Sequence, residues 1–160
     1  MENANNYIVI MQESLSKKLQ VLEEIIKAND LQWESVRGED LDAEKFEESV
    51  EIKDKLIMQL EQLDNGFEQL YQKVSQELQN NKSLYKDAIG TMQIQIKQIT
   101  DYSVQIQTQE ARNQKEFFSK TAQVRKEIHQ VKATNEAATG YYKNMNGLGA
   151  VEPQFLDQKK

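Results

Sequence analysis

The sequence predicts an all-α protein: an elongated antiparallel helical bundle or coiled coil of three to four long helices, with no sheet. Six glycines and one proline in 160 residues are too few for the many tight turns of a sandwich, a barrel or a βαβ fold. No segment alternates with a period of two, as a half-buried strand would. Apolar residues instead recur at steps of three and four, which is typical of helices that share a seam, beginning with Ile8, Met11, Leu15, Leu19, Leu22 and Ile26.

The length fits one domain, which we expect over residues 1–145. The first helix is predicted over about 4–36 and ends at the clearest break in the chain, residues 37–42. Gly38 suits a left-handed helix cap, and Asp40 or Asp42 can accept hydrogen bonds from the free amides of the next helix. The second helix is predicted over about 42–78, and Lys53 fills the one gap in its apolar seam.

Two further helices are predicted over about 82–110 and 112–145. The breaks before them, at residues 80–81 and 109–113, contain neither glycine nor proline, so whether residues 42–110 form one continuous helix stays open. The first helix is expected to pack on the start of the second, and the last to pack back on the third or to project. Residues 146–160 contain Gly147, Gly149 and Pro153 and no seam, which indicates a flexible tail.

Composition excludes several functional classes. The net charge of −6 argues against nucleic acid as a partner. No apolar run approaches the roughly 18 residues of a membrane span, and the N-terminus does not resemble a secretory signal, so we expect a cytoplasmic protein without membrane insertion. With no cysteine and His129 as the only histidine, the chain offers no metal site, no cofactor site and no nucleophile–base pair, and we expect no enzyme.

The fourth predicted helix is the candidate partner-binding element. Its seam is the thinnest of the four, and residues 111–144 carry seven bases against three acids, whereas residues 34–61 carry ten acids against four bases. An amphipathic helix with a sparse seam can exchange partners and bind a groove. The anchors predicted for a helical client are Phe117, Val124, Ile128 and Val131.

The chain resembles bacterial flagellar export chaperones of the FlgN and FliT type. The resemblance covers most of residues 10–147 and rests on two stretches. One is the helix, acidic turn and helix that contains Phe46-Glu47-Glu48, Glu51-Ile52-Lys53-Asp54-Lys55-Leu56-Ile57 and Leu60-Glu61-Gln62-Leu63-Asp64. The other follows the last amphipathic segment and contains Asn135, Thr139, Tyr141, Tyr142, Asn144, Met145 and Gly147. The third and fourth segments run longer than the family pattern.

The resemblance implies a cytoplasmic export chaperone without catalytic activity. Such proteins bind the helical termini of late flagellar subunits, the hook-associated or filament-cap proteins, and deliver them to the export gate. It further implies that Tyr142, with Tyr141 second, contacts the gate component FlhA. Two alternatives stay open: a structural coiled-coil scaffold, in which the seams pair chains into a homo-oligomer, and a regulator that sequesters another helical protein.

Overall fold

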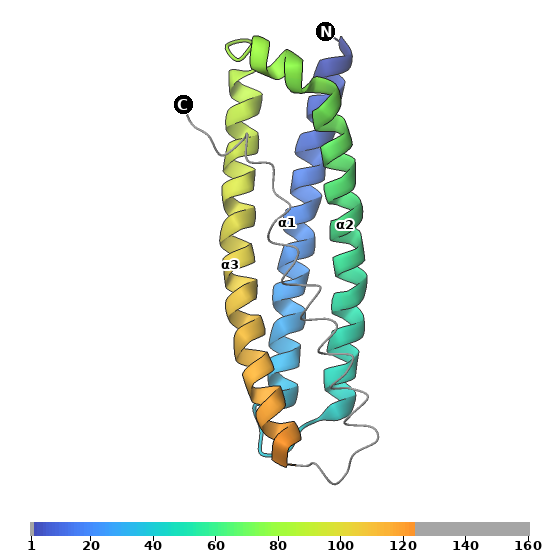
Figure 1. The fold of residues 1–160 in the computed structure, drawn as a ribbon, viewed down its shortest axis with the longest axis vertical. Helices are drawn as coiled ribbons and strands as arrows, with labels where there is room; N and C mark the ends of the chain where they lie inside the picture. Colours follow the sequence, from blue (N-terminus) through green and yellow to red (C-terminus); the bar gives the residue numbers. More distant parts are fainter. Residues whose placement is uncertain (1, 124–160) are drawn as a thin grey trace.

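The computed structural model describes residues 2–123, which form three long helices and no strand (Figure 1). α1 spans Glu2–Val36, α2 spans Ala43–Asn80 and α3 spans Lys86–Gln123. At 1.5 Å per residue, α2 and α3 are each about 57 Å long. The predicted all-α class is confirmed. The described part of the chain contains three helices, where the sequence predicted three to four.

α1 packs against both other helices along its length, and it runs antiparallel to α2 and parallel to α3. The Nζ atom of Lys73, near the end of α2, lies 5.3 Å from the ring centroid of Tyr7, near the start of α1. Gln95, near the start of α3, donates a hydrogen bond to the carbonyl oxygen of Gln12 at 3.1 Å. α1 packs on the start of α2, as expected, and its contacts also continue to the end of α2 and along α3.

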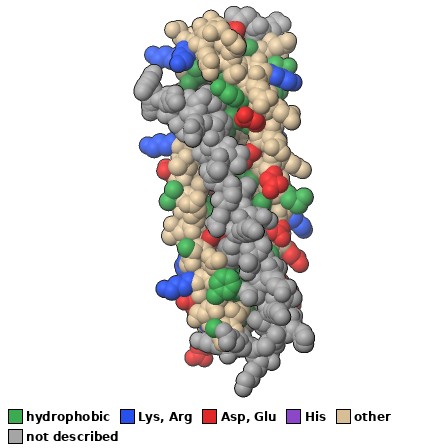
Figure 2. Space-filling view, viewed as in Figure 1, with side chains coloured by type: hydrophobic (Ala, Val, Ile, Leu, Met, Phe, Trp, Pro, Cys, Tyr) green, Lys and Arg blue, Asp and Glu red, His purple; other side chains and the backbone are tan. Residues whose placement is uncertain are grey.

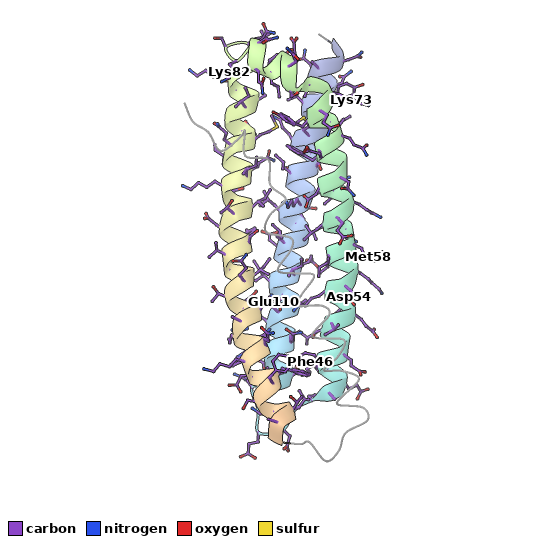
Figure 3. All side chains as sticks on the ribbon, in the orientation of Figure 1. Phe46, Asp54, Met58, Lys73, Lys82 and Glu110 are labelled. Carbon is purple, nitrogen blue, oxygen red and sulfur yellow. The ribbon has the colours of Figure 1, made fainter. Side chains whose placement is uncertain are left out.

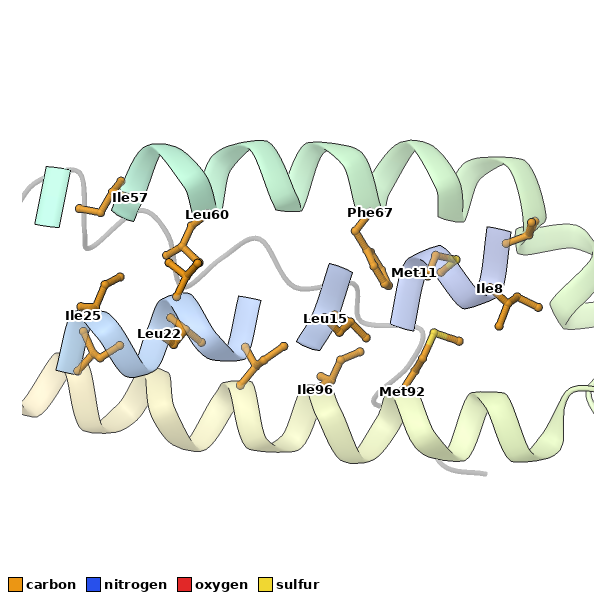
Figure 4. Packing of buried hydrophobic residues seen from close by; sticks show 14 of the residues in the cluster. Ile8, Met11, Leu15, Leu22, Ile25, Ile57, Leu60, Phe67, Met92 and Ile96 are labelled. Atoms are coloured by element: carbon orange, nitrogen blue, oxygen red, sulfur yellow. The ribbon is translucent and has the colours of Figure 1, made fainter. Parts of the chain in front are cut away.

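The core lies where the apolar stripes of the three helices meet (Figure 4). Met11 and Leu15 of α1 lie between Phe67 of α2 and the pair Met92 and Ile96 of α3, and all five side chains are buried. Each of these residues belongs to a seam with steps of three and four residues. That spacing keeps one face of every helix toward the same axis.

The first break lies where the sequence predicted it, and Asp42 is the cap. Its side chain accepts a hydrogen bond from the backbone N–H of Lys45 at 3.1 Å, which satisfies one of the free amides at the start of α2. The left-handed conformation predicted for Gly38 was wrong, because no described glycine has a positive φ. The chain instead leaves α1 with the Arg37 N–H bonded to the Trp33 carbonyl oxygen at 2.9 Å.

The second break is also present, so residues 42–110 do not form one continuous helix. α2 ends at Asn80, and a turn over residues 81–85 leads into α3. The third predicted break, at residues 109–113, was wrong: α3 continues through it to Gln123. Glutamine and glutamate favour helix, and the polar side chains here are bonded across the bundle rather than to their own backbone.

None of the three helices, within residues 2–123, combines the length and apolarity that crossing a bilayer requires. On the face shown in Figure 2, charged side chains are spread among uncharged ones, and some hydrophobic side chains are also exposed.

Shortening a core side chain tests the placement of the α2 seam. Leu60→Ala and Phe67→Ala should each lower the free energy of unfolding by about 2–5 kcal/mol, because both side chains are buried among all three helices. Gln62→Ala, on the exposed face of the same helix, should change it by less than about 0.5 kcal/mol. Urea denaturation followed by circular dichroism measures all three, and equal effects would show that the seam is misplaced.

Candidate functional site

The structure places one of the predicted partner-binding residues, and it corrects its role. Phe117 has 0% of its surface exposed, and its ring stacks on that of Phe46 with 4.3 Å between centroids. It therefore closes the core at the end where α2 begins and cannot be an open anchor for a client. Val124, Ile128, Val131, Tyr141 and Tyr142 lie outside the described residues, as does most of the helix predicted over 112–145.

One to two turns above the stacked phenylalanines, six polar side chains from all three helices are buried together. This polar layer consists of Asn29, Gln32, Lys53, Gln109, Glu110 and Asn113. Sequence reasoning found only Lys53, as the gap in the second seam. The spacing of Ile25, Asn29, Gln32 and Val36 continues the first seam. Polar residues at seam positions were therefore the sequence signal that could have indicated the polar layer.

Lys53 is the centre of the polar layer, and its side chain is 0% exposed. Its Nζ atom lies 2.8 Å from Oε2 of Glu110 and donates to Oε1 of Gln32 at 3.0 Å. The same Gln32 oxygen accepts from Nδ2 of Asn113 at 3.0 Å. One lysine of α2 is thus bonded to both of the other helices. Its partner Glu110 on α3 is labelled in Figure 3.

A second set of hydrogen bonds joins α1 to α3 directly. Asn29 donates to Oε1 of Gln109 at 3.0 Å, and Asn113 donates to the carbonyl oxygen of Asn29 at 2.9 Å. Gln109 in turn donates to the carboxylate of Asp30 at 3.2 Å. Sliding α3 by one turn would break these hydrogen bonds and leave their buried donors and acceptors without partners. The polar layer therefore fixes the register of α3 against the parallel α1.

Burial lowers the pKa of Lys53 in the polar layer. Loss of hydration lowers the pKa of Lys53 from 10.5 to about 8, and the attraction of Glu110 offsets only part of that effect. The lysine is therefore charged at neutral pH, held by a carboxylate and an amide oxygen. This arrangement orders three helices; a buried ammonium paired in this way has no access to a substrate.

The outer surface of α3 differs in kind from that of α2. Between residues 88 and 109 only Lys97 and Asp101 are charged. A row of exposed residues at steps of three and four follows the outside of the helix, and we call it the charge-poor stripe: Thr91, Ile94, Gln98, Asp101, Gln105 and Thr108. Ile94 is its most apolar member, with 63% of its surface exposed.

α2 instead carries an acidic edge, which we define as Glu47, Glu51, Asp54, Glu61 and Glu68. All five are exposed, and acidic side chains follow the α2 side of the face seen in Figure 2. Like charges in a row repel one another, and both burial and the neighbouring Glu51 raise the pKa of Asp54, against the attraction of Lys53. A basic partner would relieve that repulsion.

Within residues 2–123, no three histidine or carboxylate side chains are grouped to hold a metal ion. What this part of the chain offers to other molecules is two long helix surfaces of different chemistry. The charge-poor stripe suits an uncharged or apolar helix, and the acidic edge suits a basic one.

Removing one member of the buried ion pair should be costly. Lys53→Met takes the cation away from the buried Glu110 carboxylate, and we expect the free energy of unfolding to fall by about 3–5 kcal/mol. Lys53→Met/Glu110→Leu should recover most of this loss, because no buried charge then remains at the pair. Urea denaturation of both variants is the measurement. A double variant as unstable as the single one would contradict the assignment of the cost to the unpaired carboxylate.

The same lysine predicts a pH dependence of stability. Its pKa in the folded chain, about 8, lies below the 10.5 of the unfolded chain. Between these values the unfolded chain binds more protons, so the free energy of unfolding contributed by Lys53 should rise as the pH rises from 8 toward 10.5. Denaturation at pH 7, 8, 9 and 9.5 should show the rise as a difference between wild type and Lys53→Met. A constant difference over this range would contradict the prediction.

Comparison of the chain with protein-family models, with curated proteins and with solved structures finds no match in any of the three.

Proposed function

We propose that the protein is a non-enzymatic chaperone that binds a helical segment of another protein along the outside of the α1–α3 pair. The resemblance to FlgN and FliT chaperones supplies the client class, the helical termini of hook-associated or filament-cap subunits. It also supplies the cytoplasmic setting and delivery to FlhA, for which Tyr142 and Tyr141 remain the proposed contacts.

The charge-poor stripe of α3 is the observation that carries the proposal. An exposed helix face normally bears charges, which keep it solvated, and depletion of charge is the compositional mark of the centre of a protein interface. Over about 26 Å of α3, from residue 91 to residue 108, the exposed stripe contains one charged residue, Asp101. Its spacing of three and four is also that of a helix seam, here on the side away from the core.

α1 extends this surface with an apolar residue of its own. Gln95 donates to Oγ of Ser16 at 2.9 Å and thereby joins α1 to α3 at this level. Val9 of α1 is 50% exposed and lies within about one helical turn of Ile94 along the bundle axis, because the two helices run parallel. Two β-branched side chains are thus available as anchors at the same end of the stripe.

A client helix laid along the stripe would bury Ile94 and Val9 and form hydrogen bonds to the amides of Gln98 and Gln105. Glutamine amides donate and accept, so they can pair with many helix surfaces without the specificity of charges. This suits a chaperone that holds a segment temporarily. Subunits that polymerise through helical termini carry exposed seams of the type that needs such a cover.

A charge on the stripe should weaken client binding. We expect Ile94→Lys to raise the Kd for the terminal helical segments of hook-associated and filament-cap proteins by about tenfold to a hundredfold, because burying one isoleucine side chain contributes about 1.5–3 kcal/mol. Ile52→Lys introduces the same charge at an exposed isoleucine of α2 and should leave the Kd unchanged. Fluorescence anisotropy of labelled segments measures both variants, with melting curves as the folding control.

The outcomes separate the alternatives. Equal affinity in wild type and Ile94→Lys would place the client elsewhere. If no flagellar segment binds but the wild-type chain associates with itself in sedimentation velocity, and Ile94→Lys does not, the stripe pairs two copies and the protein is a scaffold.

A further inference from the structure

We propose that the client helix carries a basic residue seven or eight positions away from the apolar residue that it lays on Ile94. The inference deepens the proposed function and rests on it, because it names the chemistry of the segment that the α1–α3 pair binds. The residues of α1 that lie beside the charge-poor stripe carry the argument.

Hydrogen bonds at steps of seven residues join α1 to α3 beside the stripe. Three residues of α3 donate to residues of α1 that lie 79 positions earlier: Gln95 to Ser16, Tyr102 to Glu23 and Gln109 to Asp30. The three donor–acceptor distances are 2.9, 2.9 and 3.2 Å. A step of seven keeps residues on one side of a helix in a bundle, so these α1 residues form a row on the flank that faces α3. Val9 lies one step before Ser16 and begins this α1 row.

The α1 row changes in chemistry along the bundle. It begins with Val9, an apolar side chain that is 50% exposed, and ends with the exposed acids Glu23 and Asp30. The charge-poor stripe beside it changes in the same direction, with Ile94 at the Val9 end and Asp101 farther along α3. One end of this surface therefore favours an apolar side chain, and the other favours a cation.

Glu23 and Asp101 lie at almost the same level of this surface. Asp101 is seven residues from Ile94 in the same stripe, which is about 10 Å along α3. Tyr102, which donates to Glu23, is eight residues from Ile94, or about 12 Å. A client helix has the same rise per residue. Its position that reaches both carboxylates is therefore seven or eight residues from the one that covers Ile94.

Both carboxylates can accept hydrogen bonds from a cation of the client. Asp101 is exposed, and within residues 2–123 it forms no ion pair, although Lys97 lies about one turn before it. Glu23 accepts one hydrogen bond from Tyr102, and an ionised carboxylate offers about four acceptor positions. A lysine or arginine of the client can thus bond to either acid without breaking a contact of the bundle.

The nearby bases of α1 and α3 are in contact with other groups. Nζ of Lys27 lies 3.6 Å from Oε2 of Glu24. The guanidinium of Arg112 lies 4.4 Å from the ring centroid of Trp33. The negative charge beside the stripe is therefore available to a partner.

The two acids select among helices that Ile94 alone would accept. An uncharged helix laid here removes water from both carboxylates without replacing their hydrogen bonds, and an acidic helix is repelled. A helix with a base at this level avoids both costs. The apolar end of the surface thus supplies attraction, and the acidic end supplies discrimination.

A displayed library of helices tests the inference on the full chain. The library is an alanine-rich helix of about 20 residues, with its aliphatic residues confined to the middle turn and lysine, glutamate or glutamine at the polar positions. Helices selected on the wild type should carry lysine seven or eight positions from the aliphatic turn about threefold more often than the unselected library.

Changing the acids of the protein should change what is selected. Asp101→Asn/Glu23→Gln keeps an acceptor for the Tyr102 hydroxyl and should abolish the preference for lysine. Asp101→Lys/Glu23→Lys should reverse the preference to glutamate. Glu39→Lys/Glu48→Lys makes the same change of net charge at exposed positions away from this surface and should keep the preference for lysine. Melting curves confirm that each variant folds.

A titration with one selected helix measures the size of the effect. Fluorescence anisotropy at low salt should give a Kd about tenfold higher for Asp101→Lys/Glu23→Lys than for the wild type. In about 0.5 M salt the difference should fall below about threefold, because the charges are exposed and screened.

The outcomes distinguish this inference from the proposed function. If the selected helices bind the wild type but not Ile94→Lys, and show no preference for lysine or one that the acid variants leave unchanged, the inference is overturned and the docking surface stands. If no helix is selected, or if the selected helices bind Ile94→Lys as well as the wild type, both are overturned.

Discussion

The structure depends on the burial of two flanks of a single helix. α1 cannot shield its apolar stripe alone, and it packs against α2 on one side and α3 on the other. The two partners share one core through α1, while their own backbones stay apart. Every other feature follows from this arrangement: the parallel α1–α3 pair, the long side chains that bridge α2 and α3, and the surfaces left facing outward.

Apolar seams of this regularity do not by themselves select one register, because a shift by one heptad matches similar side chains again. The polar layer supplies the selection. Lys53 and Glu110 are stabilised by each other only when α2 and α3 stand at one height, and Asn29 meets Gln109 and Asn113 only in one register of α1 and α3. Burying these polar groups removes their hydration, and the lowered pKa of Lys53 reflects that cost. The hydrogen bonds of the layer disfavour other registers of the three helices.

The surfaces divide in a way that gives each face a different kind of partner. The outside of α3 has few charges and exposed β-branched residues, which favours a partner helix held by apolar contact and amide hydrogen bonds. The edge of α2 is acidic, which favours a basic partner.

Local pattern alone determined much of the fold. The spacing of apolar residues determined that the chain is helical and which face of each helix is buried. The acidic break at residues 37–42 determined where α1 ends and α2 begins, with Asp40 or Asp42 as the candidate cap, of which the structure shows Asp42. Those features depend on neighbours in the chain, which a sequence displays. Even Lys53 was placed correctly in the seam, since its position follows from periodicity whatever its chemistry.

Tertiary contacts decided the rest. The polar run at residues 109–113 reads as a break in isolation, but its side chains are bonded to α1 and α2 and α3 continues through it. Phe117 reads as an open anchor in a sparse seam, but it is buried against Phe46, which lies 71 positions earlier in the chain. The groups that bond a buried polar side chain, and those that bury an apolar one, come from segments far away in sequence. Only the packed structure shows whether such a residue is a break, an anchor or part of the core.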